Sequence, residues 1–297
     1  MPDSNKVYKI GDLTVTKIEE QVIPGIPPGY LYPKLSPQDF AAIEPALAPH
    51  DLGATRADVN ISVHTWLVRT PKHIILVDTS SGNHKDHPQN PLFHQLNLPY
   101  LQRLADAGVR PEDVDYVFNT HLHVDHVGWN TVREKDKWIP TFPNARYLIP
   151  SVERDYYSSP ASHNEANIPS LGTYEDSVLP VIEAGLVDSI GPDGGPVLDY
   201  FTFVPTPGHS IGHMSIEFSS NGDRAIFAGD VMHSPIQVVR PDINSVFCEF
   251  LDQATESRRK ILDHVAQNDA LYFGTHFAGR SVGRITRNDG GYLWIPE

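Results

Sequence analysis

The sequence predicts a single α/β domain in which helices pack outside strands. Strand-like and helix-like segments alternate along the 297 residues, and no glycine- or serine-rich linker separates the two halves. The hydrophobic fraction of 40% is sufficient for a substantial core at this length. We therefore expect one domain over residues 1–297, with a proline-rich excursion at about residues 21–58.

The N-terminal half contains the clearest strand patterns. Apolar and polar residues alternate over residues 7–20 around Gly11-Asp12, which predicts a hairpin. The periodicity predicts further strands at 59–68, 73–77, 116–118 and 145–149, and helices at 98–107, 152–157 and 174–186, the last interrupted by Pro180. Seven prolines lie between residues 24 and 49, so we expect an ordered excursion that covers a site or forms a subunit contact; a surface loop without a role is the alternative.

The C-terminal half follows the same plan without detectable sequence repetition. The predicted elements are strands at 201–204, 213–218, 224–228, 270–273 and 291–296, and a helix at 252–266. The largest basic cluster, Arg258-Arg259-Lys260, lies on this helix and is interpreted as its solvated face.

Charge and cysteine content exclude several classes of function. The chain has 23 Lys+Arg against 37 Asp+Glu, a net charge of −14, which disfavours a nucleic-acid partner. The single cysteine, Cys248, excludes an intrachain disulfide framework and a cysteine-rich metal site. Fifteen histidines indicate that any metal site uses imidazole and carboxylate ligands.

Targeting patterns are absent from the sequence. The first six residues, Met1 to Lys6, lack the basic start and apolar stretch of a signal peptide, and no run approaches the ~18 apolar residues of a membrane span. We expect a cytoplasmic protein with no membrane partner.

The densest chemical pattern is the segment HLHVDH at residues 121–126. His121, His123 and Asp125 share parity, so they project to one side of an extended segment, and His126 joins them only where the backbone turns. Such crowding of polar groups after a buried strand costs several kcal/mol, which a bound metal offsets.

Three further motifs follow in a recognisable order. They are Thr206-Pro207-Gly208-His209, Ala228-Gly229-Asp230 and Gly274-Thr275-His276. Together with HLHVDH they resemble the metallo-β-lactamase-fold hydrolase superfamily. The resemblance implies a four-layer αββα sandwich with a metal site between the edges of two sheets.

The resemblance also implies a ligand set for two metal ions, and no organic cofactor. His121, His123 and His209 would bind the first ion, Asp125, His126 and His276 the second, and Asp230 both. Asp78 would support this centre rather than ligate. The set suits two Zn²⁺ ions per chain, and iron, manganese or cobalt tolerate it.

The motif details are most similar to the lactonase-like members of the binuclear branch. Many quorum-signal lactonases have a tyrosine three residues after the bridging aspartate, whereas this chain has His233. An imidazole N–H there could donate the same hydrogen bond to the substrate carbonyl; a solvent-facing loop residue is the alternative. His213 is expected to support His209.

Our hypothesis is a binuclear zinc hydrolase of a small-molecule lactone or carboxylic ester. Metal-bound hydroxide would attack the carbonyl, His233 would stabilise the oxyanion and Asp125 would shuttle the proton. One alternative is hydrolysis of activated aryl esters, organophosphates or halogenated aromatics, and another is a non-catalytic metal-binding scaffold or sensor. The proline-rich excursion is a candidate homodimer contact.

Overall fold

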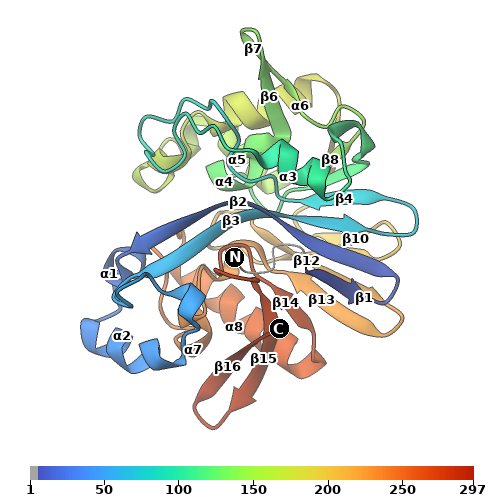
Figure 1. Ribbon diagram of the computed structural model, residues 1–297. Helices are drawn as coiled ribbons and strands as arrows, with labels where there is room; N and C mark the ends of the chain where they lie inside the picture. The colour runs from blue at the N-terminus through green and yellow to red at the C-terminus, as the bar shows by residue number, and fades with distance from the viewer. Residues whose placement is uncertain (1–5) are drawn as a thin grey trace. The chain divides into compact units, whose positions relative to one another are not determined.

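The computed structural model describes residues 6–297 and contains two seven-stranded sheets (Figure 1). The described chain divides into two compact units. The motif unit comprises residues 6–21 and 63–195, and the C-terminal unit comprises residues 22–62 and 196–297. None of the helices within residues 6–297 combines the length and the apolar character needed to cross a bilayer. The expectation of a single domain stays a prediction.

The sheet of the motif unit has the strand order β1-β2-β3-β4-β5-β8-β9. Its strands are β1 (Val7–Ile10), β2 (Leu13–Ile26), β3 (Val59–Arg69), β4 (Ile74–Val77), β5 (Tyr116–Phe118), β8 (Arg146–Pro150) and β9 (Val187–Ile190). The strands expected at these positions are confirmed, except β9, which the periodicity does not predict. A separate hairpin of β6 (Thr131–Glu134) and β7 (Lys137–Pro140) also lies outside the expectations.

The strands β4, β5 and β8 run parallel, so their carboxyl ends share one edge of the sheet. Asp78 follows β4, the HLHVDH segment follows β5, and Glu153 lies three residues after β8. Ligand sites of α/β sheets form outside the carboxyl ends of the strands. The parallel pairing thus brings these polar residues to one place.

The helices of the motif unit are α3 (Tyr100–Asp106), α4 (Val124–Val127), α5 (Ser151–Tyr157) and α6 (Leu179–Glu183). Side chains of α3, α5 and α6, including Leu104, Tyr157 and Val181, pack with the strand residues Val117 and Tyr147 in one buried cluster. The expected helix over 174–186 is instead a π-helical turn at Tyr174–Val178 followed by α6. Pro180 is the second residue of α6 rather than an interruption of a helix, because the backbone N–H groups of a first helical turn have no partner within the helix.

The sheet of the C-terminal unit has the order β10-β11-β12-β13-β14-β15-β16. Its strands are β10 (Gly195–Val197), β11 (Phe201–Pro205), β12 (Met214–Ser220), β13 (Asp223–Phe227), β14 (Leu271–Phe273), β15 (Val282–Asn288) and β16 (Gly291–Pro296). The α-helices are α1 (Pro28–Leu31), α2 (Pro37–Ile43), α7 (Ile236–Val239) and α8 (Leu251–Asn268). Both α1 and α2 belong to the proline-rich excursion, which is therefore ordered as expected.

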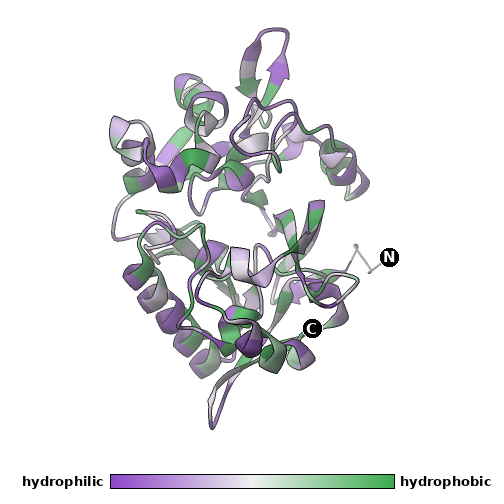
Figure 2. Ribbon diagram, turned by 90° about the vertical axis from the view of Figure 1, so that its left-hand side faces the viewer, coloured by the Kyte–Doolittle hydropathy of each residue, from purple (hydrophilic) through white to green (hydrophobic). Residues whose placement is uncertain are grey.

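Helix α8 packs its apolar face on the sheet of its own unit (Figure 1). Ile261, Leu262 and Val265 are fully buried against Ile226 of β13 and Tyr272 of β14. The burial of each such side chain stabilises the folded protein by roughly 1.5–3 kcal/mol. The helical ribbons in Figure 2 accordingly alternate hydrophobic and hydrophilic segments.

Arg258 corrects one expectation, because it is buried rather than part of a solvated face. Its guanidinium donates to the carbonyl oxygens of Val231 (2.9 Å) and Ile243 (2.8 Å) and to Oδ1 of Asn244 (2.9 Å). Arg259 and Lys260 are exposed as expected. The spacing of Arg258 from Ile261 and Leu262 puts it on the apolar face of α8, and this periodicity could have revealed its burial.

Candidate metal centre

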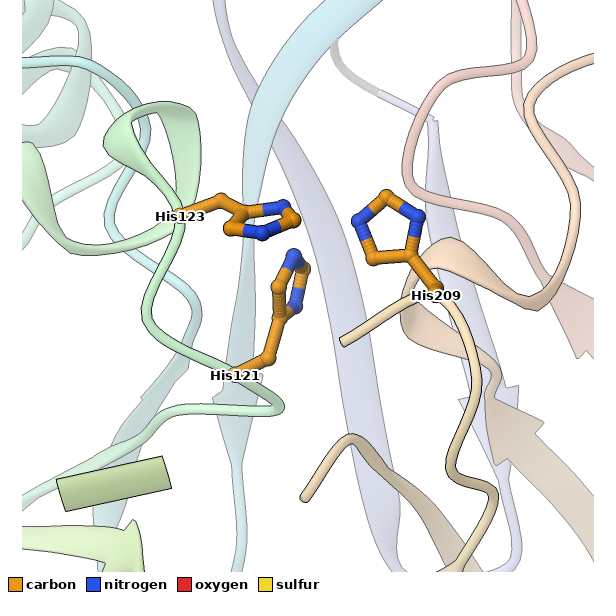
Figure 3. A group of neighbouring side chains, drawn as sticks. All are labelled: His121, His123 and His209. Atoms are coloured by element: carbon orange, nitrogen blue, oxygen red, sulfur yellow. The ribbon is translucent and has the colours of Figure 1, made fainter. Parts of the chain in front are cut away.

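The HLHVDH segment changes from extended to helical backbone at His123. His123 is the extended residue before α4 (φ −73°, ψ 161°), and Asp125 and His126 lie within that helical turn. The ring centroid of His121 is 4.6 Å from that of His123 and 4.0 Å from that of His126. The turn therefore brings His126 to the other histidines, as the spacing predicts. Figure 3 shows His121 and His123 on this segment and His209 on the loop after β11.

Asp78 orients His126 and the start of the segment. Its Oδ2 lies 2.9 Å from Nδ1 of His126 and accepts a hydrogen bond from the Thr120 hydroxyl at 2.9 Å. Its Oδ1 accepts the backbone N–H of Thr120 at 2.8 Å. A carboxylate on Nδ1 fixes the ring and favours Nε2 as the ligating atom. Asp78 thus has the supporting role expected for it.

Two further residues bind the backbone of the segment, and neither belongs to a motif of the sequence. The fully buried Glu153 accepts the N–H of Leu122 at 3.1 Å, and the hydroxyl of Ser170 accepts the N–H of Val124 at 3.3 Å. Each contact joins residues at least 31 positions apart in the chain. The position of Glu153 just after the parallel strand β8 is the one sequence feature that could have indicated it.

Glu20 of β2 supports the loops on both sides of Asp78 and His126. Its buried carboxylate accepts the backbone N–H groups of Ser81 (2.9 Å) and Gly82 (3.1 Å) and the indole N–H of Trp129 (2.7 Å). Burial raises the pKa of Glu20 to about 7, and these hydrogen bonds oppose the rise. Trp129 also stacks on Tyr100 at 5.0 Å, so it is a core residue here.

In the C-terminal unit, three imidazoles converge on one carboxylate oxygen. Oδ2 of Asp230 lies 3.0 Å from Nε2 of His276, 3.2 Å from Nε2 of His209 and 3.3 Å from Nε2 of His233. All four side chains are at most 3% exposed. Asp230 and His276 follow the parallel strands β13 and β14, and this pairing explains why they meet.

The outer contacts of this set involve both backbone and side chains. Nδ1 of His276 lies 2.9 Å from the carbonyl oxygen of Ser62, and Sγ of Cys248 lies 3.9 Å from Nδ1 of His209. The backbone N–H of Asp230 donates to Nε2 of His213 at 2.9 Å. His213 therefore supports Asp230 directly, and its ring also lies edge-on to that of His209, with 6.0 Å between the ring centroids.

His233 lies inside the structure, so the alternative of a solvent-facing residue is wrong. It is 2% exposed, and its Nε2 lies 3.3 Å from the Ser245 hydroxyl as well as close to Asp230. Its Nδ1 is buried and has no hydrogen-bond partner among the described residues. Burial lowers the pKa of His233, and the adjacent Asp230 carboxylate opposes this shift.

The donor types fit a transition metal. Each unit supplies buried imidazoles and at least one carboxylate, the ligands that zinc, iron, manganese and cobalt accept. Within the C-terminal unit, ligand atoms of His209, Asp230 and His233 all lie within 4.8 Å of one another. Three imidazoles around one carboxylate oxygen are a donor set that suits such a metal ion.

Comparison with known proteins agrees with these features. The model of the metallo-beta-lactamase superfamily matches residues 60–276. The chain belongs to the metallo-β-lactamase superfamily. Among solved structures, AbOPH, described as a hydrolase in the beta lactamase superfamily, matches with a TM-score of 0.82 at 25% identity, covering 99% of this chain and 97% of that one. AidC, described as a dizinc quorum-quenching lactonase, matches with a TM-score of 0.79 at 24% identity, covering 98% and 97%. The predicted α/β fold class of this superfamily is confirmed.

Several curated relatives are named N-acyl homoserine lactonase. The N-acyl homoserine lactonase of Bacillus cereus is 26% identical over 191 residues, which span 60% of this chain and 64% of that lactonase. The match thus covers less than two thirds of the relative's length.

Proposed function

We propose that this protein is a binuclear zinc hydrolase that opens a lactone or cleaves a carboxylic ester. The convergence of His209, His233 and His276 on Oδ2 of Asp230 is the observation that carries the proposal. The HLHVDH segment and superfamily membership support it, as does the name of the Bacillus cereus relative.

The proposed ligands follow the superfamily resemblance. His121, His123 and His209 would bind one ion, Asp125, His126 and His276 the other, and Asp230 both. Four of these residues belong to the motif unit and three to the C-terminal unit, so neither unit has a full set by itself. Homodimerisation and a cytoplasmic location stay predictions.

The residues of the chain would divide the work of hydrolysis. When bound, two zinc ions supply Lewis acidity and lower the pKa of a shared water to about 7. His233 would stabilise the oxygen that gains charge, since its Nδ1 has no hydrogen-bond partner among the described residues. Asp125 would accept the proton and deliver it to the leaving oxygen.

A substrate panel tests the proposal. The purified protein, its chelator-treated form and the same form reloaded with zinc would each be assayed on a lactone, an aryl ester, a thioester and a phosphotriester. We expect zinc-dependent turnover, with the lactone fastest. Preference for the aryl ester or phosphotriester would favour the alternative hydrolase, and bound metal without turnover of any member would favour a scaffold or sensor.

A further inference from the structure

The proline-rich excursion contacts two segments of its own unit, one that contains Asp230 and one that follows it in the chain. We name them the His233 segment (residues 229–240) and the Ser245 segment (residues 241–250). The carbonyl oxygen of Leu31 accepts the N–H of Val246 at 2.8 Å, and Asp39 pairs with Arg240 at 3.4 Å. The excursion thus contacts both segments, although it lies some 200 residues earlier in the chain.

The most buried of these contacts is made by Tyr32, at the end of α1. Its side chain is fully buried, and its hydroxyl lies 2.7 Å from Oγ of Ser234 and donates to Oε1 of Gln237 at 3.4 Å. Burial raises the pKa of the Tyr32 phenol, so the hydroxyl keeps its proton at neutral pH. Ser234 and Gln237 are themselves buried, which makes an unmatched polar group at this place costly.

Gln237 transmits this contact to His233. Its Oε1 also accepts the backbone N–H of His233 at 2.7 Å, and its amide nitrogen donates to the carbonyl oxygen of Ile243 at 3.1 Å. Ile243 is held in turn by the buried guanidinium of Arg258. His233 is therefore fixed through its backbone, whereas its ring contacts Asp230 and Ser245.

We propose that Tyr32 is a positioning residue for His233, and that the proline-rich excursion serves to fix the His233 segment from within the same chain. The Tyr32 hydroxyl fixes the positions of the Ser234 and Gln237 side chains, and Gln237 fixes the backbone of His233. The His233 ring therefore keeps its position against Asp230. The expected effect of Tyr32 on turnover rests on the proposed hydrolase function. Its expected effect on the backbone of residues 229–250 does not.

Hydrogen exchange tests the backbone part without any substrate. In Tyr32→Phe we expect peptides from residues 229–250 to exchange about tenfold faster than in the wild type, since the buried hydrogen bonds of the Tyr32 hydroxyl are lost. Tyr272→Phe is the matched control, because Tyr272 is a buried tyrosine of the same unit whose hydroxyl has no hydrogen-bond partner among the described residues. If Tyr32→Phe folds poorly, Ser234→Ala removes the same contact from the other side.

Kinetics test the link to His233. Tyr32→Phe should lower kcat about tenfold with little change in KM or bound metal, and it should have no further effect in a His233→Ala background. Unchanged exchange over residues 229–250, exchange raised equally throughout the C-terminal unit, or full additivity with His233→Ala would overturn the proposal. If the protein turned over no substrate, the proposed function would fail while the exchange result still decided the backbone part.

Discussion

The two sets of candidate ligands are fixed in different ways. In the motif unit, four residues lie within six positions of the chain, and side chains such as Asp78 and Glu153 orient them. In the C-terminal unit, His209, Asp230 and His276 come from three separate loops and meet at one carboxylate oxygen. The carbonyl of Ser62 orients His276 there. We infer that the motif set depends on neighbouring side chains, whereas the C-terminal set depends on Asp230 itself.

Replacing a ligand from each set should have the largest effect. His123→Ala and Asp230→Ala should each lower turnover more than about 100-fold, because each removes a proposed metal ligand. Asp230→Ala should lose more metal, since it also removes the group on which three imidazoles converge. Steady-state kinetics measures the turnover of each variant, and metal analysis measures its bound metal. Turnover persisting in a metal-free variant would contradict the ligand assignment.

Removing the carboxylate behind His126 should have an intermediate effect. In Asp78→Asn, an amide replaces the acceptor of His126 Nδ1 and of Thr120, so we expect metal affinity to fall about 10–100-fold. Competition with a chelator measures this affinity. The control is Asp188→Asn at a largely exposed ion pair with Arg146. Equal affinities in the two variants would show that the motif set does not need its side-chain support.

Neutralising Glu20 should have the smallest effect, on stability rather than chemistry. Because burial raises its pKa from 4.5 to about 7, the folded protein binds the proton more tightly than the unfolded chain. This contribution to stability is full below pH 4.5 and is lost as pH rises through 7. Between pH 5 and pH 7 the loss is about 2 kcal/mol. The free energy of unfolding of Glu20→Gln, measured with denaturant, should not show this loss between pH 5 and pH 7. The variant Glu183→Gln, changed at an exposed residue, should still show it. A parallel pH dependence in both variants would contradict this account.

The sequence predicts the motif set well because its chemistry is local. Four ligand types in one short segment after a buried strand point to a metal without tertiary information, and the resemblance adds His209, Asp230 and His276. Most strands follow from apolar alternation and turn residues. The strands β6, β7, β9, β10 and β15 are not among those predicted. The first four have only three or four residues each and little apolar periodicity.

Contacts between distant segments could not be predicted in this way. Tyr32 meets Ser234 across 202 positions, and Glu20 meets Trp129 across 109. No local pattern encodes such pairs, since each depends on how whole elements pack. The burial of Arg258 has a local signal instead, because its spacing from Ile261 and Leu262 puts it on the apolar side of α8, whereas its charge alone indicates the solvated side.

The metal content of the purified protein tests the central claim most directly. The claim is that the motif set and the C-terminal set together bind two metal ions. Elemental analysis of the wild type after equilibration with zinc should give two ions per chain, and His233→Ala should retain both. One ion or none per chain would contradict a binuclear centre.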